Sequence, residues 1–150
     1  MSQYIHKSHN VSNLLYHMVF PAKYRKIVFG EEVEKELKNI CLEISKRYEI
    51  VFLEIGTDEN HVHFLIQSVP MYSVKKIVQM VKSITAREMF RRRPEVKEKL
   101  WGGEFWSDGY FVGTVGVHGN EGTISKYVKK QGIEKKYKKL HQQQLTLPFE

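Results

Sequence analysis

The feature that most constrains the fold is the order in which two hydrophobic periodicities follow one another along the chain. Residues 10–20, NVSNLLYHMVF, alternate: Leu14, Tyr16, Met18 and Phe20 share one face. This period of two predicts a strand that is buried on at least one side. Residues 30–49, GEEVEKELKNICLEISKRYE, carry apolar residues at helical spacing behind an acidic start, which suits a helix N-terminus.

A hairpin and a second helix follow. The segments IVFLEIG and HVHFLIQS, residues 50–56 and 61–68, flank the turn TDEN and predict two short antiparallel strands. The segment SVKKIVQMVKSITAREMF, residues 73–90, has an apolar stripe at helical spacing and Ser73 in the N-cap position.

The last part of the chain repeats the change from strand to helix. Residues 104–118, EFWSDGYFVGTVGVH, predict a strand or a bent pair of strands, and residues 120–132 predict a third helix that ends near Gly132. The order is therefore β-α-β-β-α-β plus a C-terminal helix. Right-handed crossovers in this order build an α+β fold, a ferredoxin-like or RRM-like antiparallel sheet with helices on one face.

The 150 residues are enough for one domain with a proper core, which we expect over residues 1–137, with a flexible tail over 138–150. The only cysteine is Cys41, so no disulfide framework exists and a reducing cytoplasm is the expected location. No apolar run approaches the length of a membrane span and the first residues lack signal-peptide character, so we expect no membrane partner.

The net charge of +7 is concentrated in clusters, which indicates a polyanionic partner such as nucleic acid. For each single cation the alternative is plain solvation. The candidates for contacts with DNA phosphates lie in the runs KYRK and RRRP and around Tyr127: Lys23, Arg25, Arg91, Arg92, Arg93, Lys126, Lys129 and Lys130.

Two histidines, His61 and His63, stand two positions apart at the start of a predicted strand, so their side chains project from the same face. Imidazoles are neutral near pH 7 and are ready metal ligands. A pair alone is a weak signal, because hydrogen-bonded or surface histidines give the same pattern, and a third ligand is needed.

The predicted C-terminal helix offers a candidate. Tyr127 and Gln131 are four residues apart and therefore neighbours on one helical face. Gln131 offers a carbonyl oxygen to a hard cation, and Tyr127 offers a phenol as nucleophile. The alternative is that Tyr127 packs in the core and Gln131 is solvated.

Four blocks carry a resemblance to a known family: YHMVFPAKYRKIVF, ENHVHFLI, WGGEFWSDGYFVGTVG and YVKKQG. In order and spacing they resemble the single-tyrosine HUH transposases, the TnpA-like enzymes of insertion sequences that move as single-stranded DNA. The resemblance covers about residues 11–135 and leaves the tail outside it.

The resemblance implies a site and a reaction. His61, His63 and Gln131 would hold Mg²⁺ or Mn²⁺ at the scissile phosphate, and Tyr127 would attack it to give a 5′-phosphotyrosine and a free 3′-OH. It further implies subterminal DNA hairpins as partners and a homodimer whose active sites are shared between subunits. A cation at the phosphate lowers the barrier because it neutralises developing charge.

Three alternatives stay open at this stage. A domesticated relative that binds or nicks hairpin repeats has the same motifs. A non-catalytic RNA-recognition module has the same element order but needs stacking aromatics on its third strand, where this chain has histidines. A two-histidine phosphodiesterase expects a pair of His-x-Ser/Thr motifs, which this chain lacks.

Several single residues are open between function and packing. Trp101, Trp106 and Tyr110 either stack on unpaired bases or pack in the core. Asn60 or Glu59 is a candidate to orient a histidine. The sequence assigns no role to His17, Asp58 or His118.

The tail QQQLTLPFE contains Gln144, Leu147 and Phe149 in a Q-x-x-L-x-F pattern. It resembles the short peptides with which bacterial enzymes bind the replicative sliding clamp, and spaced apolar anchors on a flexible segment suit pocket binding. The sequence therefore predicts the clamp as a further partner.

Overall fold

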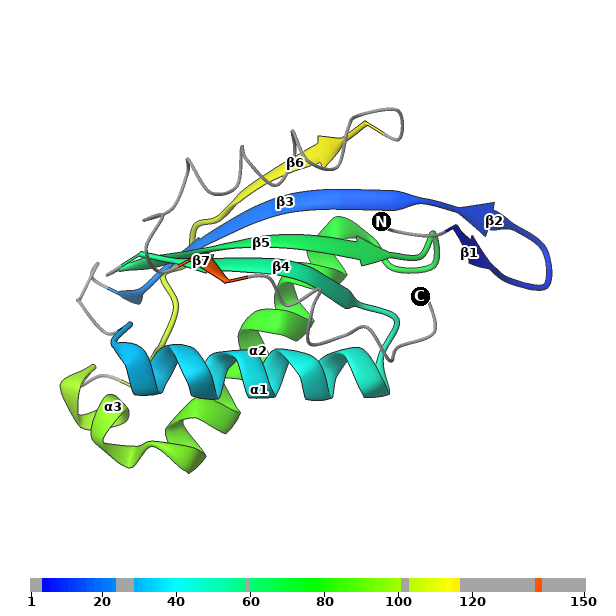
Figure 1. Ribbon diagram of the computed structural model, residues 1–150. Helices are drawn as coiled ribbons and strands as arrows, with labels where there is room; N and C mark the ends of the chain where they lie inside the picture. The colour runs from blue at the N-terminus through cyan, green and yellow to red at the C-terminus, as the bar shows by residue number, and fades with distance from the viewer. Residues whose placement is uncertain (1–3, 24–28, 59, 101–102, 117–136, 139–150) are drawn as a thin grey trace.

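The computed structural model describes residues 4–23, 29–58, 60–100, 103–116 and 137–138. A central antiparallel sheet lies in one layer, and helices α1 and α2 lie against one of its faces (Figure 1). The elements are β1 Ile5–His6, β2 Val11–Ser12, β3 Leu14–Pro21, α1 Glu31–Arg47, β4 Val51–Thr57, β5 His61–Ser68, α2 Val74–Arg92, α3 Pro94–Lys99, β6 Phe111–Val115 and β7 Tyr137–Lys138.

The sheet has the strand order β6-β3-β5-β4-β7, with every neighbouring pair antiparallel. The four strands of the predicted β-α-β-β-α-β unit are β3, β4, β5 and β6, and they occupy the order expected for a ferredoxin-like sheet. The predicted fold class is confirmed. The predicted C-terminal helix lies outside the described residues.

The two long helices begin where the sequence predicts them. Ser73 accepts a hydrogen bond from the backbone N–H of Lys76 at 3.0 Å, so it is the N-cap of α2. Helix α1 has Gly30 as its N-cap without a side-chain bond, and its first turn is acidic, which complements the helix dipole. Pro94 begins α3, as its missing N–H and fixed φ allow at a first helical position.

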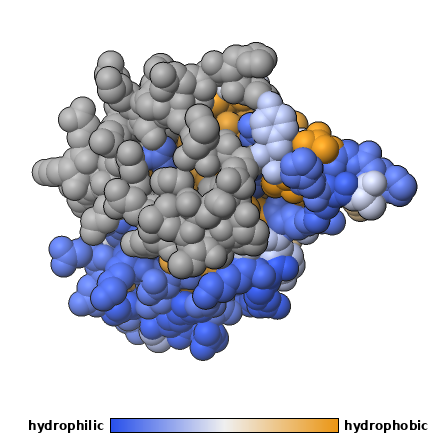
Figure 2. Space-filling view, turned by 45° about the vertical axis from the view of Figure 1, so that its right-hand side comes forward, coloured by the Kyte–Doolittle hydropathy of each residue, from blue (hydrophilic) through white to orange (hydrophobic). Residues whose placement is uncertain are grey.

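The core lies between the sheet and the two long helices. The strand residues that point into it alternate along β3 and β5, as the sequence predicts. The apolar stripes of the two helices face the same core. The buried residues are Tyr16, Met18 and Phe20 of β3, Val62, Phe64 and Ile66 of β5, Leu37, Ile40, Cys41 and Ile44 of α1, and Ile77, Val78 and Val81 of α2. Ring pairs such as Phe20–Phe64 pack edge to face across the strands. On its outer side the helical layer is hydrophilic, as the lower part of Figure 2 shows.

Three parts of the fold differ from the sequence-based expectation. The first strand begins at Leu14, after a separate hairpin of β1 and β2, rather than at residue 10. Within the described residues 104–116 the regular strand is Phe111–Val115, and Trp106 instead forms an isolated bridge with Ala22. The short elements α3 and β7 were not predicted, because two to six residues are too few to show a period.

The second face of the sheet bears the odd-numbered residues of β5, including His61 and His63. It has a smaller apolar cluster of its own, built from Leu15, Leu53 and Leu65. Between Phe52 and Glu54 the register of β4 against β5 shifts by one residue. In the part of the chain that the structure describes, no helix has the length and apolar character to cross a membrane.

Candidate active site

The two histidines of the HVH segment lie side by side on the face of the sheet away from the helices. Their ring centroids are 4.9 Å apart, while Val62 between them is fully buried in the core. The alternation of a β-strand produces this arrangement directly, so the predicted shared face is confirmed.

His63 meets a third imidazole from the neighbouring strand. Nε2 of His17 on β3 lies 3.3 Å from Nδ1 of His63, and the two rings are stacked with centroids 5.5 Å apart. Both side chains are buried, and burial lowers the pKa of His17, which keeps its ring neutral at physiological pH. His17, to which the sequence assigned no role, is thus part of the site.

His61 is held by residues of the turn before it. Its Nδ1 lies 2.8 Å from Oδ1 of Asn60, and its Nε2 lies 3.3 Å from Oδ2 of Asp58. A carbonyl oxygen only accepts, so Nδ1 donates the proton to Asn60. The predicted contact of Asn60 with a histidine is present. Asp58, to which the sequence assigned no role, lies on the Nε2 side of the His61 ring.

The turn itself is tied to its surroundings. The backbone N–H of Asp58 donates to the carbonyl of His61 at 2.8 Å, and the N–H of Ala22 donates to the carbonyl of Asn60 at 2.8 Å. Just before the turn, the buried hydroxyl of Thr57 donates to the carboxylate of Glu34 on α1 at 2.9 Å. These hydrogen bonds hold the turn that leads into β5, so the backbone that carries the two histidines is fixed in position.

The two histidines alone are too few ligands for a divalent cation, so a further ligand is needed. Over the described ranges, no three His, Cys, Asp or Glu side chains come together as a metal-binding group. Two imidazoles engaged at Nδ1 by the protein would use Nε2 to hold a cation, and the Asp58 carboxylate lies on the Nε2 side of His61. The predicted third ligand, Gln131, and the predicted nucleophile, Tyr127, lie outside the described residues, as do Arg25, Lys126, Lys129, Lys130, His118 and Trp101.

Comparison with known proteins gives a family. A family model described as "Transposase IS200 like" matches residues 10–131. The chain belongs to the IS200-like transposase family. This membership confirms the predicted family and an enzyme that acts on DNA, and it decides against a non-catalytic RNA-recognition module.

Relatives of this IS200-like transposase match over most of their length. The chain is 36% identical over 123 residues to the ISDra2 transposase TnpA of Deinococcus radiodurans, which is 81% of this chain and 86% of the relative. It is 30% identical over 142 residues to the transposase for insertion sequence element IS200 of Salmonella typhimurium, which is 95% of this chain and 90% of the relative.

Solved structures agree in fold. A crystal structure described as a candidate transposase from Deinococcus radiodurans R1 matches with a TM-score of 0.68 and 30% identity, over 85% of this chain and 98% of that one. A tyrosine transposase associated with REP sequences, solved bound to a REP hairpin, matches with a TM-score of 0.53 and 6% identity, over 100% of this chain and 88% of that one. At that identity the second match shows the fold alone.

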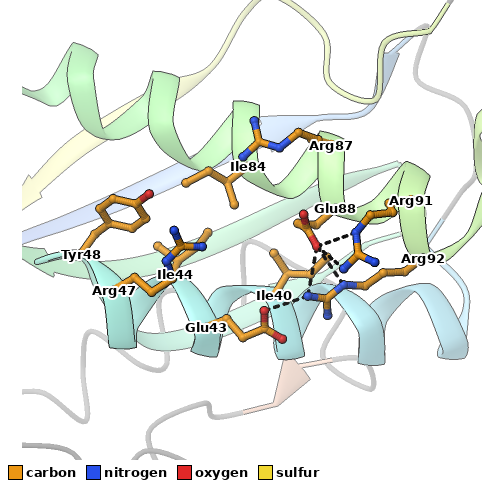
Figure 3. Close-up of a pocket in the computed structure, with 10 residues that line it drawn as sticks. All are labelled: Ile40, Glu43, Ile44, Arg47, Tyr48, Ile84, Arg87, Glu88, Arg91 and Arg92. Atoms are coloured by element: carbon orange, nitrogen blue, oxygen red, sulfur yellow. Dashed lines mark hydrogen bonds and ion pairs between the residues drawn. The ribbon is translucent and has the colours of Figure 1, made fainter.

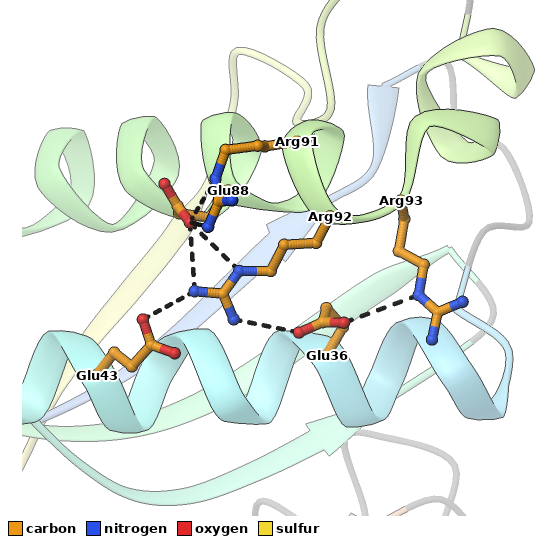
Figure 4. Close-up of polar contacts among 6 residues, drawn as sticks. All are labelled: Glu36, Glu43, Glu88, Arg91, Arg92 and Arg93. Carbon is orange, nitrogen blue, oxygen red and sulfur yellow. Dashed lines mark hydrogen bonds and ion pairs between the residues drawn. The ribbon is translucent and has the colours of Figure 1, made fainter.

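The arginine cluster of the IS200-like transposase lies in the helical layer, across the sheet from the histidines. Arg92 of α2 reaches between the two helices to Glu36 at 3.1 Å and Glu43 at 2.7 Å on α1, and it also contacts Glu88 of its own helix (Figure 4). Arg93 pairs with Glu32 at 2.7 Å. These ion pairs give Arg92 and Arg93 a part in joining α1 to α2, and their predicted contact with DNA stays a prediction.

Beside this network is a pocket of about 300 Å³ between α1 and α2 (Figure 3). Four arginines and two glutamates line it, together with Tyr48 and three isoleucines: Arg47, Arg87, Arg91, Arg92, Glu43, Glu88, Ile40, Ile44 and Ile84. Of the three consecutive arginines Arg91, Arg92 and Arg93, the arginine triad, Arg91 is the most exposed, with 66% of its side chain accessible, and it bonds to Glu88 at 2.7 Å.

Three other candidates are placed by the structure. Lys23 pairs with Glu104 at 3.3 Å, just past the end of β3. Trp106 is buried in the core and does not face solvent, so the packing interpretation is correct for it, whereas Tyr110 is 44% exposed.

Proposed function

We propose that this IS200-like transposase cleaves and rejoins single-stranded DNA at the ends of an insertion sequence. His61, His63 and Gln131 would hold a Mg²⁺ or Mn²⁺ ion, and Tyr127 would be the nucleophile. The observation that supports this most is the pair of imidazoles on β5, 4.9 Å apart, each engaged at Nδ1 by a side chain of the same chain. That arrangement is what two metal ligands on one strand require.

The reaction is a displacement at phosphorus. The phenol of Tyr127 releases its proton to solvent as its oxygen forms a bond to the phosphorus. The bond from the phosphorus to the 3′-oxygen breaks, and that oxygen takes up a proton from solvent and leaves as a 3′-OH. The product is a 5′-phosphotyrosine, which conserves the bond energy, so a later 3′-OH can displace the tyrosine and restore the strand. A bound divalent ion supplies charge neutralisation at the non-bridging oxygens.

We propose DNA hairpins near the element's ends as the substrate feature that the protein recognises. The support is the hairpin bound to the structurally similar REP-associated transposase, together with the basic clusters of this chain. Lys126, Lys129 and Lys130 would contact the backbone next to Tyr127, with Lys23, Arg25 and the triad Arg91–Arg93 as further contacts.

Two partners complete the proposal. One is a second copy of the chain, with each active site taking its histidines from one subunit and its tyrosine helix from the other. The other is the sliding clamp, bound through Gln144, Leu147 and Phe149. Removing residues 142–150 should abolish clamp binding in a pull-down and leave DNA cleavage unchanged, which distinguishes the tail from the catalytic domain.

The decisive experiment detects the covalent intermediate. Single-stranded DNA carrying an element end is incubated with the protein and Mg²⁺ and run on a denaturing gel. We expect a protein–DNA adduct that disappears with chelator, in Tyr127→Phe and in His61→Ala. The matched controls are Tyr4→Phe and His9→Ala, which change exposed residues outside the five-stranded sheet and should keep the adduct.

An adduct of undiminished yield in Tyr127→Phe would remove Tyr127 from its role, and one that survives chelation would remove the ion. A domesticated relative would also form the adduct. Excision and insertion of a marked element in cells separates the two, because only an active transposase performs both.

A further inference from the structure

The structure points to His17 as a positioning residue for His63: we infer that the His17 ring accepts a hydrogen bond from Nδ1–H of His63 and thereby directs Nε2 of His63 toward the cation. The inference deepens the proposed function and rests on it for the identity of the metal ligand. The contact itself is a property of the folded chain.

The first step is the geometry of the contact. Nε2 of His17 and Nδ1 of His63 are 3.3 Å apart, and the planes of the two rings differ by 14°. Each nitrogen of a neutral imidazole either donates or accepts, so one of these two carries the shared proton.

The second step is the tautomer. A histidine that coordinates a cation through Nε2 must carry its proton on Nδ1. If His63 carries it there, His17 accepts with Nε2 and has its own proton on Nδ1. The opposite arrangement, with His17 donating, would place the proton of His63 on Nε2 and block coordination. The site therefore works only with His17 as the acceptor.

The third step is the rigidity of His17. It lies in the middle of β3, which is paired on both sides, with β5 and with β6. The ring of Phe111 on β6 meets it edge to face with centroids 5.6 Å apart, and only 4% of His17 is exposed. A ring packed between two others has little freedom to turn away from His63.

The same nitrogen is engaged in the second ligand. Nδ1 of His61 lies 2.8 Å from Oδ1 of Asn60, so both histidines of the pair are engaged at Nδ1, while Nε2 of His61 lies 3.3 Å from Oδ2 of Asp58. An amide serves one ring and an imidazole from the adjacent strand serves the other. A metal-ligating histidine ordinarily has a carboxylate, carbonyl or water in this place, which makes an imidazole acceptor a specific feature of this site.

The test begins with the unmodified protein and needs no metal or DNA. Nitrogen-15 NMR of the histidine side chains distinguishes the two neutral tautomers. We expect metal-free His63 to carry its proton on Nδ1. A His63 with its proton on Nε2 overturns the inference, whatever any variant does.

Variants then test the dependence on His17. His17→Phe keeps a flat ring and removes the acceptor, whereas His17→Gln keeps an acceptor oxygen. We expect Phe to mix the tautomers of His63 and to weaken Mn²⁺ binding by about ten- to a hundred-fold, the usual effect of losing such a partner. Binding is followed by paramagnetic broadening of the His61 and His63 signals.

His17→Gln should stay closer to the unmodified protein in both measurements, and His9→Phe, at an exposed site, should change neither. Equal tautomers and equal Mn²⁺ affinity in His17→Phe and in the unmodified protein would overturn the inference. Should His17→Phe fail to fold, the inference is still tested by the tautomer of His63 in the unmodified protein and by the tautomer and Mn²⁺ affinity of His17→Gln. Failure of the covalent-adduct experiment leaves these measurements untouched, so the two proposals fail separately.

Discussion

Trp106 donates its indole N–H to the hydroxyl oxygen of Thr85 at 2.8 Å, and both side chains are buried. The Thr85 hydroxyl in turn donates to the carbonyl of Val81, one turn earlier in α2, at 2.6 Å. The backbone of Trp106 is bridged to Ala22, just after β3. This chain of contacts ties the segment ahead of edge strand β6 to both layers of the fold, which places β6 beside His17.

Replacing Thr85 by Val should therefore lower the free energy of unfolding. The change leaves the buried indole N–H without its acceptor, which costs about 1–3 kcal/mol. Urea unfolding measures it, with Thr114→Val at an exposed position of β6 as the matched control, expected within about 0.5 kcal/mol of the unmodified protein. A Thr85→Val protein as stable as Thr114→Val would show that the bond contributes nothing.

The members of the arginine triad should contribute unequally to the free energy of unfolding. Arg92 has 17% of its side chain exposed and contacts three carboxylates, whereas Arg91 has 66% exposed. Arg92→Met should cost about 1.5–3 kcal/mol, because it leaves clustered carboxylates without their cation. Arg91→Met should cost clearly less, because an exposed ion pair contributes little to stability. DNA affinity measured on the same two proteins tests the separate prediction of phosphate contacts, and equal stability of the two variants would argue against the structural role of Arg92.

Acid should weaken the ion pairs that Glu88 makes with Arg91 and Arg92 within α2. Hydrogen bonds from Arg91, and then from Arg92, hold the pKa of the Glu88 carboxyl below its ordinary value of 4.5. The unfolded chain therefore takes up this proton at a higher pH than the folded one, so the stabilisation is complete above the ordinary value and is lost as pH falls through the folded pKa. Unfolding curves measured at several pH values below about 5 give the free energy of unfolding as a function of pH. This free energy should fall less steeply with decreasing pH in Glu88→Gln than in the unmodified protein. An identical slope in the two proteins would show that Glu88 does not contribute to the acid sensitivity.

Replacing Asn60 should raise the Mn²⁺ concentration that DNA cleavage requires and leave the fold intact. Asn60→Ala removes the acceptor of His61 Nδ1–H but keeps the backbone carbonyl that accepts from Ala22. We expect the Mn²⁺ concentration for half-maximal adduct formation to rise about tenfold or more, with the rate recovered at saturating Mn²⁺. Asn60→Asp retains an acceptor oxygen and serves as the comparison. An unchanged Mn²⁺ requirement in the alanine variant would mean that Asn60 does not orient the ring.

Local periodicity determined the parts of this fold that depend on one segment at a time. The two-residue alternation in HVHFLIQS was enough to place His61 and His63 on one face, because side chains of a strand alternate whatever it pairs with. Ser73 marked the start of α2 for a similar reason, since its cap needs only the backbone three residues on. The family resemblance then assigned roles to positions that periodicity alone left open.

Tertiary structure decided which distant residues meet. His17 and His63 are 46 positions apart and touch only because β3 pairs with β5 in the register that sets Val19 opposite His63. Arg92 joins the two helices only because the packing of α2 on α1 brings Glu36 and Glu43 within reach of it. Strand register and helix packing are fixed by the burial of the whole core, a sum over many residues that no short segment contains, so these contacts could not be predicted from the sequence.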